Sequence, residues 1–576
     1  MSQEEFIDIF YPFDSLAFPS VCSPTMQELL REWEAMPPIP TTDWRPLEAA
    51  WKFALGEPQE GLNTSLQSLP PHREITEIPH RTLHPDTPYW YTSTVPLPAP
   101  CVLEIGADDG AQLYLDGIRI PMQGDTFLVA GEPRTVEMVV RVLNKAVYGG
   151  LEWVRVTEWE SFERYTQAVT RRSRLSALVR KLRLLKEPTT AQISLVCTAI
   201  HNENETTLQA AWQSMAHLPL TLVSPLLLNT TSRSTTVLWE TDVPCKGAVE
   251  WGRYAIDNVV ESEGESTLHI VELEGLLPDT SYVYRVRSGS VVSPVYTFQA
   301  LPEQGSFAFT YWSDAHCNEG TNANNATFRQ TVNALRQVPS SFTVGGGDMV
   351  EDGNHLMPWL HFFESLAPLA CRVPIWLMGG NHEYDRCFED LHSVYLERYM
   401  KICPAPHYFA WSASNARFVA LDPNLYFPTG IPEGSEEYEW FMQELESEEW
   451  REAEWHFVFI HQPPYSQGWL DYEGDIPIRD LLEPLIEKYR IDFVVSGHTH
   501  DYERLTKQYG NQTTHFLVLG GAGGGIEDGA MSPQPVMDRV LRRYHFGYFR
   551  VEESSVIFEA IATDMRVLDT LVVTKE

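Results

Sequence analysis

The sequence predicts a multidomain protein in which two β-sandwich modules precede an α/β domain. Two observations predict it. Short, turn-separated runs of alternating polar and apolar residues recur at 81–157 and 219–302, and apolar strands alternate with helical stretches from residue 303 onward. The chain of 576 residues is long enough for roughly three to five domains at about 100–200 residues each, and each can bury its own core.

Composition and charge exclude several classes of protein. Apolar residues make up 43% and charged residues 21% of the chain, so wholesale disorder and collagen-like repeats are not expected. No apolar stretch is long enough to cross a bilayer, which argues against a membrane protein. The net charge of −37 argues against nucleic acid as a partner. A small phosphate compound stays possible, because bound metal ions can reverse the local field.

The N-terminus and the cysteines bear on the location of the protein. The first residues, MSQEEFIDIFYPFDSL, carry acids and no continuous apolar run, so we expect no export signal. The eight cysteines are scattered and form no CxxC pair, unlike the disulfide framework of a small secreted domain. We therefore expect free thiols and a cytoplasmic protein.

The first part of the chain predicts a wrapping segment followed by a β module. Residues 1–80 are rich in Pro and Trp and show one plausible helix, Thr25–Met36. Residues 81–157 predict a β-sandwich of jelly-roll type. Asp116 and Gly117, between the runs LYL and IRI, predict a tight hairpin turn inside it.

A helical connector and a second β module come next. Residues 158–218 have helical texture and include the basic run RRSRLSALVRKLRLLKE. In so acidic a chain this run predicts a connector helix docked on its neighbours, and less readily a helix lying on a membrane surface. Residues 219–302 predict an immunoglobulin-like sandwich of short strands.

Five apolar runs in the last part of the chain each end at polar residues of metal-binding type. The carboxyl ends of parallel strands meet at one edge of a sheet, where α/β proteins form their sites. We therefore expect these polar residues to gather at one edge of one sheet. They are Asp314, His316, Asp348, Asn381, His382, His461, His498 and His500. The intervening helices are expected at 325–338, 355–370, 388–400, 436–446 and 478–489.

The residue types indicate a site for catalytic metal ions. His and Asp suit Zn, Mn or Fe, and the absence of cysteine at these positions argues against a structural zinc site. Eight such side chains exceed the needs of one ion but suit two ions about 3.5–4 Å apart that share a carboxylate. In extended chain, residues two apart face the same way, so Asp314 and His316 can both reach one cavity, as can His498 and His500.

The motifs that carry these residues resemble those of the calcineurin-like metallophosphoesterases, and more closely those of the purple acid phosphatase branch. In chain order they are D-x-H at 314–316, G-D at 347–348, GNHE at 380–383, HQPPY at 461–465 and GHTHDYER at 497–504. The module at 219–302 resembles the fibronectin-type-III-like N-terminal domain of that branch. The resemblance implies an αββα sandwich for residues 303–576.

The resemblance also implies a ligand set and a reaction. The ligands of the first ion would be Asp314, His316, Asp348 and His500. The ligands of the second would be Asp348 as the bridge, Asn381, His461 and His498. The implied reaction is hydrolysis of a phosphoester by a metal-bound hydroxide, with Asp348 and His382 as catalytic residues. His382 would bind no metal, and would donate a proton to the leaving alkoxide or hold its oxygen.

One position departs from the purple acid phosphatase pattern. Purple enzymes carry a Tyr three residues after the bridging Asp, and that Tyr binds ferric iron and gives the colour. Glu351 stands there in this chain, and His316 stands where purple enzymes usually have Gly. We therefore expect a colourless site with two divalent ions, Mn, Zn or ferrous Fe.

Other residues near the motifs have two interpretations. Asn381, His382, His355 and Tyr465 are candidates for contact with substrate, although His355 also fits a helix N-terminal turn capped by Asn354. Tyr465 is about as suited to packing. We expect Arg504 to pair with a carboxylate. The glycine-rich run 519–525 lacks the G-K-[ST] ending of a phosphate-binding loop, so we expect a simple loop after a strand.

Three functions stay open. The site suits hydrolysis of phosphate monoesters, as in acid phosphatases, or of phosphodiesters, because the walls of the pocket decide between them. The third is a non-catalytic glycan-binding scaffold. The stretch 107–117 resembles carbohydrate-binding jelly-roll modules, and Asp108 and Asp109 are either its ligands for sugar or calcium or simple turn residues. Because no metal ligand is missing, we favour an enzyme with a small phosphoester substrate and no nucleic-acid or membrane partner.

Overall fold

The structure is a computed structural model of the whole chain. It describes residues 29, 31–56, 73–74, 77–84, 87–107, 110–123, 126–144, 148–185, 188–201, 205–318, 323–384, 394–400 and 407–575. Asp108 and Asp109, the expected sugar or calcium ligands, lie outside these residues. Of the expected helix Thr25–Met36, Leu29 and residues 31–34 are helical.

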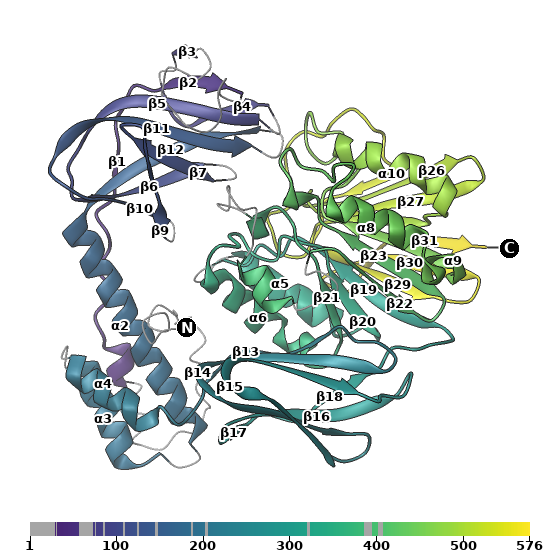
Figure 1. Ribbon diagram of the computed structural model, residues 1–576, viewed down its shortest axis with the longest axis horizontal. Coiled ribbons are helices and arrows are strands. Elements are labelled where there is room, and N and C mark those ends of the chain that lie inside the picture. Colours follow the sequence, from purple (N-terminus) through teal and green to yellow (C-terminus); the bar gives the residue numbers. More distant parts are fainter. Residues whose placement is uncertain are drawn as a thin grey trace.

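Two six-stranded sheets pack face to face in the first module (Figure 1). One sheet contains β1 (Arg45–Pro46), β12 (Tyr148–Glu158), β6 (Cys101–Ala107), β10 (Thr126–Val129) and β9 (Met122–Gln123), with β4 (His80–Leu83) beside β12. The other contains β3 (Arg73–Glu74), β2 (Lys52–Leu55), β5 (Thr87–Leu97), β11 (Arg134–Asn144), β7 (Ala111–Leu115) and β8 (Ile118–Ile120). Asp116 and Gly117 both have positive φ and join β7 to β8, so the expected hairpin is confirmed.

The first module begins earlier than the sequence suggested. β1 pairs with β12 and β2 pairs with β5, so residues 45–55 belong to the sandwich and not to a wrapping segment. Trp51 and Phe53 lie in its hydrophobic core. The expected boundary at residue 80 was wrong because strands of two and four residues are too short to display a recognisable alternation.

Three helices connect the two β modules: α2 (Trp159–Leu184), α3 (Thr190–His201) and α4 (Glu205–Met215). The long helix α2 runs from the first sandwich to the second (Figure 1). The basic run lies largely in α2, where its apolar side chains Leu175, Leu178, Val179 and Leu182 are buried against α3 and α4. Among the described helices, none combines the length and apolar character needed to span a membrane.

A buried ion pair fastens this connector to the second module. Lys181 of α2 lies 2.5 Å from Asp242, and both side chains are almost completely buried. The Lys181 ammonium also donates to the carbonyl oxygen of Leu218, and Asp242 accepts the N–H of Leu220. Because removing one partner would leave a buried charge uncompensated, this pair fixes the position of α2.

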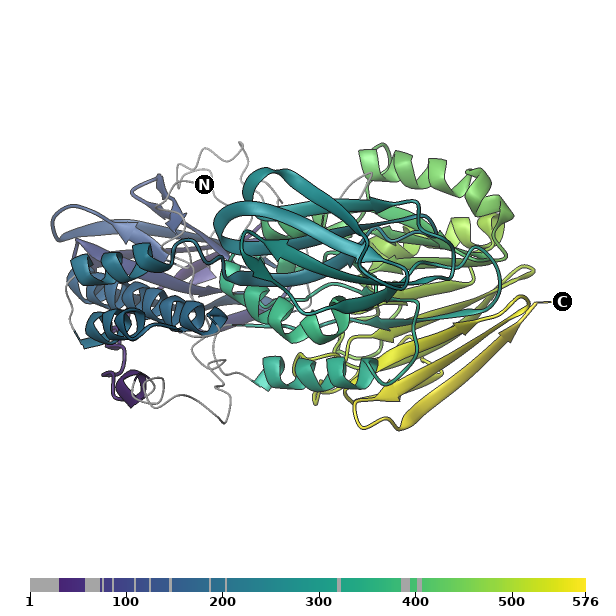
Figure 2. The same cartoon turned by 90° about the horizontal axis from the view of Figure 1, so that it is seen from below.

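The second module is a β-sandwich built on two long, bent strands. Its strands are β13 (Thr221–Leu228), β14 (Ser234–Gly252), β15 (Asn258–Glu274), β16 (Ser281–Ser288), β17 (Val291–Val292) and β18 (Tyr296–Gln299). The first half of β14 pairs with β13 and the second half with β16, so this strand takes part in both layers. The module packs on the last domain, where the Tyr284 hydroxyl donates to the carbonyl of Cys371 (Figure 2).

The last domain contains two facing mixed sheets. The first has the order β21 (Ile375–Leu377), β20 (Phe342–Gly345), β19 (Phe307–Trp312), β29 (His545–Val551), β30 (Ser555–Ala562) and β31 (Val567–Thr574). The second has the order β22 (Phe409–Ala413), β23 (Ala416–Leu421), β24 (Trp455–Ile460), β25 (Phe493–Ser496), β27 (Gln512–Leu519), β26 (Tyr502–Tyr509) and β28 (Arg539–Leu541). Aromatic rings such as Phe309, Phe418 and Phe457 fill the space between the sheets.

Helices cover the outer faces of both sheets. On the first sheet lie α5 (Ala323–Leu335), α6 (Leu356–Ala370) and α7 (Val394–Tyr399). On the second lie α8 (Glu436–Leu445), α9 (Glu448–Glu452) and α10 (Ile476–Tyr489). Two short 3₁₀ helices are η3 (His382–Tyr384) and η4 (Pro423–Leu425). The expected αββα sandwich after two β modules is thus confirmed (Figures 1 and 2).

The strands that end in candidate ligands belong to both sheets. β19, β20 and β21 run parallel in the first sheet, and β24 and β25 run parallel in the second. The expectation of one edge of one sheet was therefore wrong. Periodicity reveals buried strands but not which sheet each one joins, and here the two sheets present their carboxyl ends to the same end of the sandwich.

Candidate metal centre

The eight polar residues expected at strand ends lie together in the structure. Each lies within five residues of the end of β19, β20, β21, β24 or β25, where the chain leaves the sheet. His382 and His500 are half-buried, and the other six are buried. They are Asp314, His316, Asp348, Asn381, His382, His461, His498 and His500.

One group of donors consists of Asp314, His316 and His500. The Nε2 atoms of His316 and His500 are 3.0 Å apart. The Asp314 Oδ1 atom lies 3.6 Å from His500 Nε2 and 3.9 Å from His316 Nε2. Three donor atoms therefore face one point, at spacings that suit ligands of a single ion.

A second group consists of Asp348, His461 and His498. The Asp348 Oδ2 atom is 3.1 Å from His461 Nε2, and Nδ1 of His498 is 3.0 Å from Oδ1 of Asn381. Asp348 Oδ2 also lies 3.6 Å from His316 Nε2 in the first group. Asp348 therefore stands between the two groups, where the sequence resemblance placed a bridging ligand.

Hydrogen bonds to the outer nitrogens orient three of the imidazoles. His316 Nδ1 lies 3.1 Å from a Glu351 carboxylate oxygen. His461 and His500 place Nδ1 2.8 Å from the carbonyl oxygens of Gly346 and Gly525. A carbonyl oxygen can only accept, so Nδ1 carries the proton there and the Nε2 lone pair faces the cavity, as metal binding requires. His461 Nε2 is buried and lies 3.1 Å from Asp348 Oδ2, so the imidazole and the carboxylate point to the same part of the cavity.

Four of the candidate ligands have a backbone conformation that non-glycine residues rarely adopt. φ is positive at Asp314, His316, Asp348 and His498. Asp314 and His316, the two residues of the D-x-H motif, face one cavity because each lies in a left-handed turn. The explanation expected from the sequence, an extended chain that points residues two apart the same way, was wrong. Strain of this kind persists only where the surroundings fix it, and it gathers at functional sites.

Glycines allow other parts of the chain to approach the donors closely. A side-chain carbon at Gly380 would lie 2.3 Å from Asp348 Oδ1, and one at Gly347 would lie 2.6 Å from His461 Nδ1. Gly524 lies against the rings of His316 and His500, and its N–H donates to the Asp314 carbonyl. The run 519–525, interpreted from the sequence as a simple loop, is thus a wall of the centre.

Sequence reasoning missed the residue that holds the ligand turns. Glu383 is fully buried, and its carboxylate accepts the backbone N–H groups of Asp348, Met349, Val350 and Gly380 at 2.7–3.3 Å. It thereby joins the turn after β20 to the turn after β21. Glu383 is the last residue of the GNHE motif, and this position was the signal in the sequence that could have revealed its role.

Two aromatic rings beside the second group were also missed. The rings of Trp469 and Tyr472 lie 4.9 and 5.8 Å from the ring of His498, measured between centroids. They follow the HQPPY motif in sequence. These half-buried rings shield one side of His498 from solvent.

Burial and neighbouring charges shift the pKa values of the buried acids and bases. Burial raises the pKa of Asp314 to about 6 and that of Glu383 to about 8. For Asp348 the charges of His461 and His382 outweigh burial and hold the pKa well below its ordinary value. Burial lowers the pKa of His461, but the Asp348 carboxylate outweighs this and raises it to about 9. Without metal, His461 and Asp348 therefore form a buried ion pair.

Three other residues singled out in the sequence have structural contacts. Tyr465 is buried in the core beneath α10, and its hydroxyl contacts Glu483 and Tyr509, so its expected contact with substrate was wrong. His355 pairs with Asp352 and is itself the N-cap residue of α6, a position that the sequence assigned to Asn354. Arg504 donates to Asp569 at 2.8 Å, as expected.

The fold and the donor set define a metallophosphoesterase domain. Residues 308–502 match the family model of calcineurin-like phosphoesterases. A purple acid phosphatase from seeds of yellow lupin (Lupinus luteus) has a similar fold, with a TM-score of 0.55 and 16% sequence identity over 85% of this chain and 93% of that one. By sequence, residues 308–502 thus form a calcineurin-like phosphoesterase domain, and its fold is similar to that of a purple acid phosphatase.

Curated relatives with similar sequences come from plants and fish. "Probable inactive purple acid phosphatase 27" of Arabidopsis thaliana is 28% identical over 51% of this chain and 55% of the relative. "Purple acid phosphatase 22" of the same plant is 25% identical over 50% of this chain and 65% of the relative. "Acid phosphatase type 7" of Danio rerio is 24% identical over 54% of this chain and 78% of the relative. The chain thus spans less than two thirds of the two plant relatives.

We predict that the protein stays colourless when loaded with iron. The position that would supply a phenolate is Glu351, and its carboxylate orients His316, so the site offers imidazole where purple enzymes offer tyrosine. The visible absorption spectrum after anaerobic loading and air oxidation measures this. An intense visible band that disappears in Tyr472→Phe would show that a nearby tyrosine binds the iron after all.

We also predict that metal affinity rises with pH between about 6.5 and 9. The pKa of His461 in the metal-free fold is about 9, above its ordinary value of 6.5. Its pairing with Asp348 therefore stabilises the metal-free protein fully below pH 6.5, and this stabilisation is lost as pH rises through 9. Metal must displace the proton, so affinity increases by up to about tenfold per pH unit over this interval.

Anaerobic titration with Mn²⁺ at pH 6.5, 7.5 and 8.5 checks this expectation. Calorimetry in two buffers of different ionisation enthalpy counts the protons released. Equal affinity at all three pH values, with no proton release, would show that His461 is already neutral in the metal-free protein.

Proposed function

We propose that the chain is a binuclear metal-dependent phosphoesterase that hydrolyses phosphate monoesters. The observation that carries the proposal is the pair of His/Asp donor groups joined by Asp348, at the shared end of two sheets. The proposed ligands of the first ion are Asp314, His316, Asp348 and His500. Those of the second are Asp348, Asn381, His461 and His498. The proposed ions are divalent Mn, Zn or Fe.

The donor set fits two divalent ions. Four imidazoles, two carboxylates and one amide oxygen face the cavity, and no cysteine is among them, which is the composition of a catalytic and not a structural metal site. When bound, two such ions would acidify a water molecule and neutralise charge on phosphoryl oxygens. The chain itself contributes orientation: Glu351, Gly346 and Gly525 fix the imidazoles, and Glu383 fixes the turns.

His382 is suited to assist the leaving group. The backbone N–H of His382 donates to Asp348 Oδ1 at 3.0 Å, which fixes the residue beside the proposed bridging ligand. Its Nδ1 lies 2.9 Å from the carbonyl oxygen of Glu351, so Nδ1 carries a proton there and Nε2 is the nitrogen proposed to face the substrate. In the proposed reaction a protonated His382 donates from Nε2 to the departing alkoxide oxygen.

Two other functions compete with this proposal. A phosphodiesterase would use the same ligands and differ only in the walls of the pocket. A scaffold without activity is the other, and it is relevant because some curated relatives have names that call them inactive. The complete set of donors in this chain favours an enzyme over a scaffold.

We also propose that the protein works in the cytoplasm on a small phosphoester, without nucleic acid or membrane as partners. Within the part of the chain that the structure describes, Cys101, Cys245, Cys317 and Cys371 are free thiols, as a reducing compartment favours. The net charge of −37 opposes binding to a polyanion.

We expect the Mn-loaded protein to hydrolyse para-nitrophenyl phosphate faster than bis(para-nitrophenyl) phosphate. Chelation of the metal should abolish both activities, and re-addition of Mn²⁺ should restore them, because the proposed site supplies charge neutralisation only when occupied. Release of nitrophenol measures both reactions. Faster turnover of the diester would establish the competing phosphodiesterase, and no turnover with two ions bound per chain would establish the scaffold.

His382→Ala should retain the metals and lower kcat for an alkyl phosphate, whose leaving alkoxide needs a proton, by about 100-fold or more, the usual contribution of a general acid. The loss should shrink for esters whose leaving groups need no protonation, because an acid matters least for them. His217→Ala, which changes an exposed histidine of the connector, serves as the matched control. Equal kinetics of His382→Ala and His217→Ala would remove His382 from the proposed role.

A further inference from the structure

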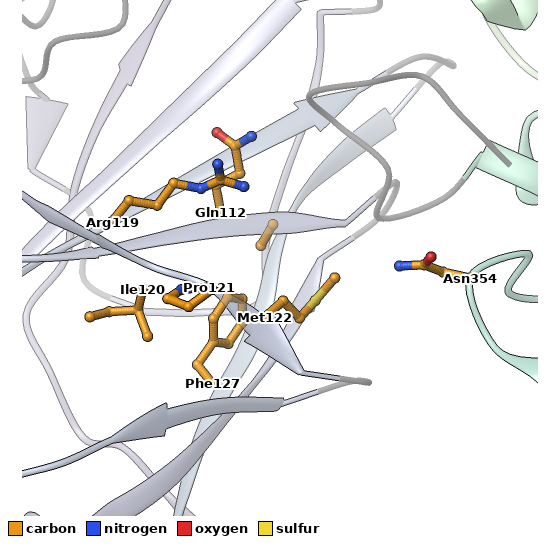
Figure 3. Close-up of a pocket in the computed structure, with 8 residues that line it drawn as sticks. Gln112, Arg119, Ile120, Pro121, Met122, Phe127 and Asn354 are labelled. Carbon is orange, nitrogen blue, oxygen red and sulfur yellow. The ribbon is translucent and has the colours of Figure 1, made fainter. Parts of the chain in front are cut away.

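A cavity of about 340 Å³ lies where the first β-sandwich meets the C-terminal domain. Gln112, Arg119, Met122 and Phe127 line it from the sandwich, and Asn354 lines it from the loop that precedes α6. Figure 3 shows Gln112 and Arg119 close together near Met122 and Phe127, with Asn354 pointing toward them from the other side. Two domains thus contribute walls to one cavity.

Gln112 presents an unused hydrogen-bond donor at this cavity. Its side chain is 3% exposed. Its Oε1 atom accepts from the Tyr114 hydroxyl at 3.2 Å and from Arg141 at 3.3 Å. A guanidinium can only donate, so this contact fixes which end of the amide is the oxygen. Among the described residues the Nε2 atom has no partner, and a buried donor in that state is costly unless a ligand or water supplies an acceptor.

The other polar groups of the cavity also favour an acceptor with negative charge. Arg119 is exposed and brings a permanent positive charge to the rim of the cavity in a chain of net charge −37. A guanidinium and an amide N–H₂ suit the oxygens of a carboxylate or a phosphate. Met122 and Phe127 supply an apolar wall, which suits the carbon chain that carries such a group.

The cavity lies near the candidate metal centre. Asn354 is three residues beyond Glu351, whose carboxylate is 3.1 Å from His316 Nδ1. Three residues span at most about 11 Å. The loop between them is fixed to the centre, because the N–H of Gly353 donates to the carbonyl oxygen of His382 at 2.9 Å. Asn354, one wall of the cavity, is therefore at most about 11 Å from the residue that orients His316.

We propose that this cavity binds the far end of the substrate, and that this end carries a second anionic group, a carboxylate or another phosphate. The proposal rests on the proposed phosphoesterase function, to which it adds a substrate class. Arg119 and the Gln112 amide would hold the anionic group, while the metal centre would hold the phosphoester. The first β-sandwich thereby becomes a specificity element and not only a packing module.

Direct binding tests the cavity without any turnover. The full chain, freed of metal by chelation, is titrated with inorganic phosphate by calorimetry. We expect saturable binding that weakens about tenfold in Arg119→Gln, as the loss of one charge-assisted hydrogen bond implies, and that stays in Arg253→Gln, an exposed arginine of the second module. Equal binding by Arg119→Gln and the unchanged chain, or binding of galactose in place of phosphate, would overturn the proposal.

Kinetics test whether the occupant is the substrate. Alkyl phosphates of increasing length are compared with the corresponding phosphates that end in a carboxylate, using Mn-loaded protein. We expect kcat/KM to favour the carboxylate at one length by about tenfold, and expect this preference to vanish in Arg119→Gln and to persist in Arg119→Lys and Arg253→Gln. Hydrolysis of both series with no preference at any length would overturn it. If no ester of either series is hydrolysed, only the proposed phosphoesterase function is contradicted. The binding of an anion in the cavity is still tested by the calorimetry.

Discussion

The carboxylate of Glu383 is the contact on which the candidate metal centre depends. It is fully buried and satisfies four backbone N–H groups from two turns, one after β20 and one after β21. Those turns carry Asp348, Asn381 and His382. A single side chain thus fixes the proposed bridging ligand relative to the proposed acid, and it can do so because glycines at the turns leave room for the backbone to approach.

Around this contact, three imidazoles, those of His316, His461 and His500, use their two nitrogens in different ways. Outer nitrogens bond to fixed acceptors, such as the Glu351 carboxylate and the Gly346 and Gly525 carbonyls, and inner nitrogens face the cavity. The glycine-rich loop after β27 completes the wall. Such an arrangement orients ligands before any ion binds, which limits the reorganisation that binding requires.

The sequence predicted which polar residues gather better than it predicted the reasons for their convergence. Motif spacing placed all eight polar residues at strand ends, and they do meet. It could not show that β24 and β25 lie in a different sheet from β19, since buried strands of both sheets have the same apolar pattern. Positive φ at Asp314 and His316 was equally hidden, because only tertiary contacts hold non-glycine residues there. Tyr465 followed a motif closely, yet its ring packs under α10, because proximity in sequence does not fix the direction of a side chain.

Each donor group draws on both halves of the αββα sandwich. Asp314 and His316 follow a strand of the first sheet and His500 one of the second, while Asp348 comes from the first and His461 from the second. Bound ions would therefore cross-link the two sheets at the end where the ligand turns meet. Every factor of ten in free metal concentration above the dissociation constant would add about 1.4 kcal/mol per site to the free energy of unfolding. The aromatic interior and the metals would then both hold the same two layers together.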